Sequence, residues 1–131
     1  MSIAGDWYNE FGSHMRLTVD SAGAVGGAYT SAAGHATGAH ALAGRYHPPG
    51  APGRGAALGW TVAWDNQQTD EGSVTSWSGQ YFEQEERIYA GWLLTRAASA
   101  ADAWESTVVG QDVFTREQPA AGPGEERRAG V

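Results

Sequence analysis

Two stretches of alternating residues near the middle of the chain constrain its fold most strongly. Residues 59–64 read GWTVAW and residues 73–81 read SVTSWSGQY. Because successive side chains of a strand point to opposite faces, one face of the first stretch carries Trp60, Val62 and Trp64. The corresponding face of the second stretch carries hydroxyls and aromatic rings, namely Ser73, Thr75, Trp77 and Tyr81. The pattern predicts two neighbouring strands that turn indoles and small hydroxyls toward the same space.

These residue types are more typical of a ligand pocket than of a plain core. A core strand usually carries Val, Ile or Leu, because a buried hydroxyl costs free energy unless it finds a partner. Flat aromatic walls with a few placed hydroxyls are typical of sites for small ligands. The alternative is that these strand-forming aromatic residues fill an ordinary core.

Short strand-like runs separated by turn residues make up most of the chain. The predicted strands are residues 6–11, 15–20, 26–32, 41–46, 59–64, 73–81, 87–95 and 106–116. Residues 97–105 are compatible with a turn of helix. Eight short, evenly spaced strands favour an all-β fold, an eight-stranded antiparallel up-and-down β-barrel, which is a size that holds one small ligand. A β-sandwich is the alternative.

The chain length is that of one domain. A chain of 131 residues can bury a real core. We expect the barrel to comprise residues 1–118. Residues 119–131 are low in apolar side chains and rich in Gly and charge, which predicts a disordered tail.

Composition excludes several kinds of partner. The formal charge is −7, with 15 acidic residues against 8 basic ones, so a nucleic-acid backbone would be repelled. There is no run of apolar residues long enough to cross a membrane as a helix, and no cysteine for a disulfide or a thiolate metal site. We expect no metal and no cofactor. The first residues lack the pattern of a signal peptide, but an exported precursor can lose its signal, and we predict a secreted protein.

The eighth predicted strand carries the most informative single residue. Alternation places Asp112 on one face with Val108, Gly110 and Phe114. A carboxylate in such an apolar setting must be paired or must serve a ligand. The alternative is a residue at the barrel end, bonded to a loop amide. The opposite faces of the last two strands are also apolar and carry Leu93, Val109 and Val113, which suggests that barrels pack against one another.

Taken together, these motifs resemble the avidin family, with the bacterial streptavidin branch closest. The matching segments are residues 5–9, 12–13, 29–31, 42–46, 57–64, 75–81, 92–95 and 109–114. The resemblance implies a barrel that binds biotin without chemistry, as a homo-oligomer and most commonly as a tetramer, a dimer of dimers. The family commonly has Asn where this chain has His35, and Gln111 replaces a histidine that stacks across a subunit interface.

The resemblance also implies roles for individual residues. Asn9, Ser13 and Tyr29 would hold the ureido oxygen of biotin, while Asp112 and Ser31 would each accept one ureido N–H. The other implied ligand contacts are Thr75 at the sulfur, Ser73 and the His35 backbone at the carboxylate, Ala33 beside them, and Trp64, Trp77, Trp92 and Leu94 around the bicyclic ring. Trp104 would come from a neighbouring subunit.

Two other functional classes are compatible with a barrel. A lipocalin-like carrier of another small apolar ligand would leave the predicted donors and Asp112 unpaired, which is unfavourable. An enzyme would need an acid/base partner for Asp112, and no histidine takes an inward position beside it in the predicted strands. The resemblance to avidins therefore remains the basis for predicting a biotin-binding protein without catalytic residues.

Overall fold

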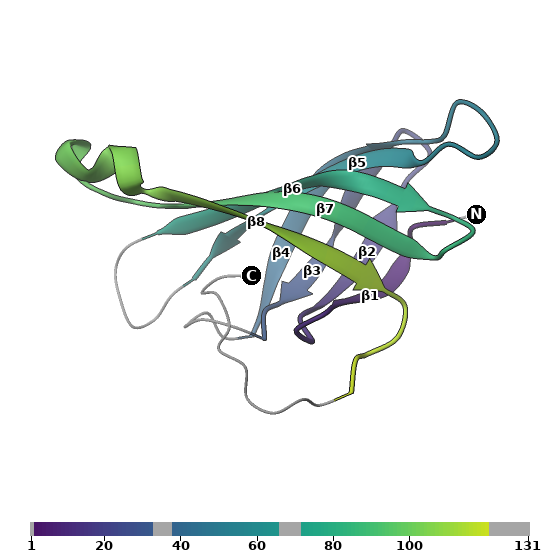
Figure 1. Cartoon of the computed structure of the whole chain (residues 1–131), viewed down its shortest axis with the longest axis horizontal. Coiled ribbons are helices and arrows are strands. Elements are labelled where there is room, and N and C mark those ends of the chain that lie inside the picture. The colour runs from purple at the N-terminus through teal and green to yellow at the C-terminus, as the bar shows by residue number, and fades with distance from the viewer. Residues whose placement is uncertain (1, 33–37, 66–71, 121–131) are drawn as a thin grey trace.

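The computed structural model describes residues 2–32, 38–65 and 72–120, which form a closed antiparallel barrel (Figure 1). Each strand pairs with its neighbours in the chain, and β8 closes the barrel against β1. The strands are β1 Gly5–Asn9, β2 His14–Val19, β3 Ala24–Thr30, β4 Ala39–His47, β5 Ala56–Trp64, β6 Ser73–Phe82, β7 Arg87–Arg96 and β8 Thr107–Thr115. The predicted up-and-down barrel is confirmed, and the β-sandwich is wrong.

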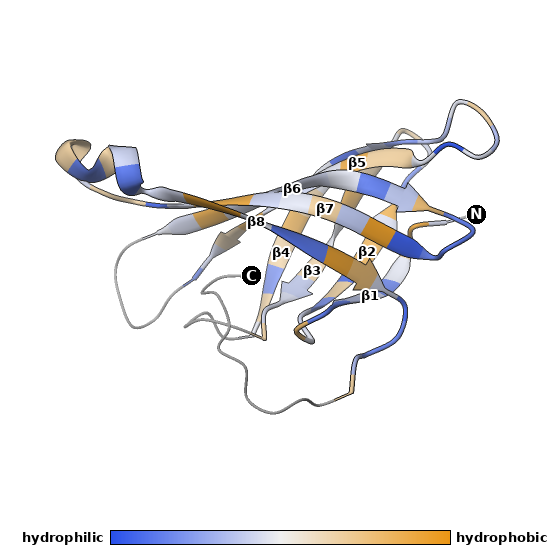
Figure 2. Cartoon of the chain, in the orientation of Figure 1, coloured by the Kyte–Doolittle hydropathy of each residue, from blue (hydrophilic) through white to orange (hydrophobic). Residues whose placement is uncertain are grey.

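Alternation along the strands separates the inside of the barrel from its outside. In β5 and β7, buried and exposed residues follow one another with a period of two, as the sequence pattern predicts. Figure 2 shows hydrophobic and hydrophilic segments interspersed along β7 and β8. The largest buried side chains in the core are Trp7, Trp60, Tyr29, Tyr81 and Phe114.

One end of the barrel, which we call the Arg116 end, contains both termini of the barrel and the turn between β6 and β7. The Arg116 guanidinium lies 3.8 Å from the centre of the Trp7 ring. Its Nη2 donates to Ser2 O at 2.8 Å, its Nη1 donates to Ala4 O and Asp6 O at 2.9 and 3.2 Å, and its Nε donates to Glu86 Oε2 at 3.0 Å. These bonds tie the start of the chain to its last strand.

Strand β1 is shorter than predicted. It ends at Asn9, not at Phe11, because the Asn9 side chain turns the chain: Oδ1 accepts the backbone N–H of Phe11 at 3.0 Å and of Ser13 at 2.9 Å. Such local side-chain bonds compete with a strand ladder. Glu10 therefore lies beyond the ladder, where its Oε2 accepts the backbone N–H of Val113 at 2.8 Å.

Strand β4 is longer than predicted. It begins at Ala39, not at Ala41, because the pairs Thr30↔Ala39 and Tyr29↔His40 extend its ladder with β3. His40 therefore belongs to a strand and lies on the same face as the buried Leu42. The sequence pattern predicts that this strand starts only at residue 41, after His40.

The link between β7 and β8 contains a short 3-10 helix, η1 (Ala100–Glu105), where a helical turn is predicted. The last strand ends at Thr115, and residues 121–131 of the predicted tail at 119–131 lie outside the described residues. In the described parts of the chain, no helix is both long and apolar enough to span a membrane.

Candidate ligand-binding site

Polar side chains are buried in the barrel interior around Asp112 and the turn between β1 and β2, a region that we call the Asp112 end. Asn9, Ser13, Thr75 and Asp112 are the buried polar or charged residues among those described. They come from the end of β1, the turn just before β2, from β6 and from β8. Buried polar groups cost free energy unless they are hydrogen-bonded, so their gathering in one barrel requires an explanation.

Asp112 is a buried carboxylate, with 3% of its surface exposed. Its Oδ2 accepts the indole N–H of Trp77 at 3.1 Å. Burial is the main cause that raises the pKa of Asp112 to about 7; the bond from Trp77 lowers the pKa, and the charge of Glu10 adds to the rise. Asp112 is therefore an acceptor with a strong need for additional N–H donors.

Two hydrogen-bond donors near Asp112 are buried without a partner. Asn9 Nδ2 and Tyr29 Oη form no hydrogen bond with any described residue. Asn9 lies close enough to lower the pKa of Asp112, but the two do not meet in hydrogen-bond geometry. Burial, and then the charge of Asp112, raise the pKa of Tyr29 well above its ordinary value, with a smaller opposing effect from Ser13. Tyr29 is thus a phenol that keeps its proton and can donate it.

Indole rings surround these groups. The register places Trp60, Trp77 and Trp92 side by side across β5, β6 and β7. Trp60 and Trp77 stack with ring centres 5.4 Å apart, and Trp92 lies against Gly110, where a Cβ would collide with the ring. At position 110, only glycine leaves room for the Trp92 ring.

The predicted meeting of indoles and hydroxyls is present in the structure. Trp64 Nε1 donates to Thr75 Oγ1 at 2.8 Å, and Leu94 is buried in the same interior. Tyr29 packs against Trp77 with ring centres 4.8 Å apart. The structure therefore brings Asn9 and Ser13 and the predicted inward residues of β3, β6, β7 and β8 into one barrel interior.

The remaining predicted residues fall into three groups. Ser31 and Ser73 are half-buried, just after β3 and at the first position of β6. Trp104 lies on η1 and is 82% exposed, so its own barrel does not bury the ring. Ala33 and His35 lie outside the described residues.

Sequence reasoning missed two polar residues of this end, Glu10 and His40. The alternation of His40 with Leu42 and Tyr46 is a signal that could have identified His40 as inward-facing. No local pattern indicates that Glu10 reaches across to the backbone of β8.

A closed eight-stranded antiparallel barrel is of a size that can hold one small ligand, and this one has buried, unpaired hydrogen-bonding groups on its inner face. The model of the Avidin family matches residues 1–117. The chain is 32% identical to Fibropellin-1 of Strongylocentrotus purpuratus over 131 residues, which cover 92% of this chain and 11% of that protein. It is 30% identical to Afifavidin of Afifella pfennigii over 116 residues, covering 87% of this chain and 69% of the relative. The chain belongs to the avidin family.

Proposed function

We propose that this protein binds biotin inside the barrel, one molecule per chain, without catalysis. One observation carries the proposal. The same interior holds two buried donors without a described partner, Asn9 Nδ2 and Tyr29 Oη, and a buried acceptor, Asp112. A cyclic urea is complementary to this set, because it has one carbonyl oxygen and two N–H groups. Membership of the avidin family supports the same ligand.

The surrounding residues suit the rest of biotin. The ureido oxygen would accept from Asn9 and Tyr29, with Ser13 beside them, and the two ureido N–H groups would donate to Asp112 and Ser31. Thr75 lies toward the sulfur, and the indoles of Trp64, Trp77 and Trp92, with Leu94, enclose the bicyclic ring. A purely apolar ligand would leave the buried donors unpaired, which argues against a lipid carrier.

The proposal is tested by retention of biotin. Purified protein is mixed with excess biotin, passed through gel filtration and denatured, and the released ligand is identified by mass spectrometry. We expect one unaltered biotin per chain. Loss of all biotin during filtration, or recovery of a modified molecule, would contradict the proposal.

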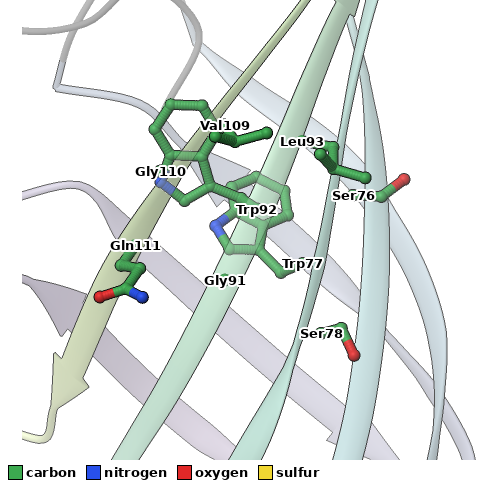
Figure 3. A pocket seen from close by; sticks show the side chains of 9 residues that line it. All are labelled: Ser76, Trp77, Ser78, Gly91, Trp92, Leu93, Val109, Gly110 and Gln111. Atoms are coloured by element: carbon green, nitrogen blue, oxygen red, sulfur yellow. The ribbon is translucent and has the colours of Figure 1, made fainter.

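We also propose that the protein is a homo-oligomer, with a tetramer as its full assembly. The outer face of β6, β7 and β8 carries Leu93 and Val109, which are 51% and 64% exposed and are paired in register. A hollow of about 450 Å³ lies on this face (Figure 3). Leu93 and Val109 line it together with Ser76 and Ser78 of β6 and with Gly91, which has no side chain to fill it. An apolar face of this kind suits an isologous contact with a second copy.

Trp104 supplies the test of this assembly. Its ring is exposed on its own barrel, and the resemblance to avidins implies that it would contact the ligand of a neighbouring subunit. Light scattering over a dilution series should show biotin favouring the larger assembly by mass action. Trp104→Ala should weaken biotin binding and remove that linkage together. A monomer that binds biotin tightly at every concentration would refute the role of Trp104 between subunits.

A further inference from the structure

His40 is an inward-facing polar residue that the contacts proposed above leave unused. It lies on β4 in register with Tyr29, and its ring centre is 5.2 Å from that of Trp64, at an interplanar angle of 67°. Its Nδ1 is buried and has no hydrogen-bond partner within the residues that the structure describes. A buried imidazole nitrogen of this kind is suited to a ligand atom.

The position of His40 is at the rim of the barrel. It is the second residue of β4, Trp64 is the last residue of β5, and Ser73 is the first residue of β6. The pairs Leu42↔Val62 and Trp64↔Ser73 place His40 and Ser73 on either side of Trp64. Three adjacent strands therefore present an imidazole, an indole and a hydroxyl in one row.

The neighbouring indole cannot satisfy His40. Trp64 Nε1 already donates to Thr75 Oγ1 at 2.8 Å, and the edge-to-face packing on His40 holds both rings in place. In this row, the His40 nitrogen thus remains available to a polar group of a bound molecule.

We propose that His40 is a specificity-determining residue that donates a ring N–H to the carboxylate of the ligand's side chain, beside Ser73. The inference rests on the proposed binding of biotin, whose ureido group would occupy Asn9, Tyr29 and Asp112 and whose acidic chain would then reach the rim. A hydrogen bond to a carboxylate is stronger than one to a neutral amide. His40 therefore makes the site prefer acidic biotin to neutral biotin amide.

The test compares biotin with biotin amide in a matched set of variants. His40→Phe keeps a ring against Trp64 and removes the nitrogens, His40→Asn keeps an N–H donor, and His47→Phe makes the same change at the opposite end of β4, where the side chain is exposed. We expect His40→Phe to lose about tenfold in biotin affinity, equivalent to roughly 1.4 kcal/mol. Its affinity for biotin amide should change less than about twofold. His40→Asn should keep part of the preference, and His47→Phe all of it.

A measurement on the unmodified protein complements the variants. In histidine-labelled protein, biotin should shift the His40 ring nitrogen signals, and biotin amide should leave them nearly unchanged. The role of His40 is wrong if His40→Phe lowers the affinity for both ligands equally, or for neither. It is also wrong if the two ligands shift the His40 ring nitrogen signals alike. In each of these cases biotin binding itself stands. If the unmodified protein binds neither ligand, the proposed function itself fails, and the role of His40 with it.

Discussion

At the Arg116 end of the barrel a guanidinium donates to Ser2, Ala4, Asp6 and Glu86 and covers Trp7, whereas at the Asp112 end two buried donors have no described partner. The first end includes a charged group whose hydrogen bonds are made within the chain. The second end includes a buried carboxylate whose pKa is raised to about 7. The same barrel thus contains one satisfied and one unsatisfied polar cluster.

This difference separates stability from binding. A buried polar group without a partner costs roughly 1–3 kcal/mol of stability, and a ligand that provides the partner recovers it. The Arg116 end therefore stabilises the barrel, and under the proposed function the Asp112 end would hold its donors and acceptor in place for the ligand. Substitutions at the two ends should then change different quantities, and the predictions below test that separation.

The largest effect is expected from Trp7→Ala. Trp7 packs against Tyr81 at 5.7 Å between ring centres, lies under Arg116, and donates from Nε1 to Ile3 O at 2.8 Å. Loss of this ring should lower the free energy of unfolding by about 3–5 kcal/mol. Denaturant titration measures this loss of unfolding free energy. Biotin affinity of the folded variant should change little, and a large loss of affinity at unchanged stability would contradict the division between the two ends.

The opposite behaviour is expected of Asp112→Ala. Removal of the acceptor should weaken biotin binding by about 1.5–3 kcal/mol, the range for a hydrogen bond to a charged group. The free energy of unfolding without ligand should change less, because removal of a desolvated carboxylate offsets the loss of its bond from Trp77. Calorimetric titration and denaturant titration measure the two quantities. An unchanged affinity for biotin would show that Asp112 has a structural role and does not contact the ligand.

The raised pKa of Asp112 predicts two pH dependences of opposite sign. The native carboxyl binds its proton more tightly than the unfolded one, whose pKa is about 4. Its contribution to stability is therefore full below about pH 4 and is lost as the pH rises through about 7. Biotin needs the ionised acceptor, so its affinity should fall by up to about tenfold per pH unit below that pKa.

Two variants isolate this titration from the other carboxylates. Asp112→Asn should lack both dependences, so subtracting its profiles from those of the unmodified protein leaves the titration of Asp112 alone. Glu10→Gln removes a charge that raises the pKa of Asp112, so both profiles should move to lower pH. Identical profiles in the unmodified protein and in Asp112→Asn would show that another group titrates.

The barrel interior was predictable from alternation alone. A period of two does not depend on loop geometry, so Trp64, Thr75, Trp77 and Asp112 could be placed inward from their own strands. The expected roles of Asn9, Ser13 and Tyr29 came only from the resemblance to avidins. A hydroxyl or amide on a strand can equally well be a structural residue whose hydrogen bonds are made within the fold. The structure shows that Asn9 and Tyr29 each retain a buried donor that no described residue accepts.

Contacts between distant parts of the chain were not predictable. Arg116 reaches Ser2, and Glu10 reaches Val113, through side chains at opposite ends of the sequence. Strand limits also depend on such contacts: β1 ends where Asn9 binds the backbone of its own turn, and β4 begins where His40 pairs with Tyr29. Local propensity does not contain this information.

The most direct measurement is a calorimetric titration of biotin into the unmodified protein, Tyr29→Phe and Tyr81→Phe. Both tyrosines are buried in the barrel, but Tyr29 lies at the Asp112 end and Tyr81 packs on Trp7 at the Arg116 end. We predict one biotin per chain and equal affinity for the unmodified protein and Tyr81→Phe. Tyr29→Phe should lose about 1 kcal/mol of binding free energy, the typical value of one hydrogen bond. Absence of binding to the unmodified protein, or equal losses in the two variants, would contradict the account.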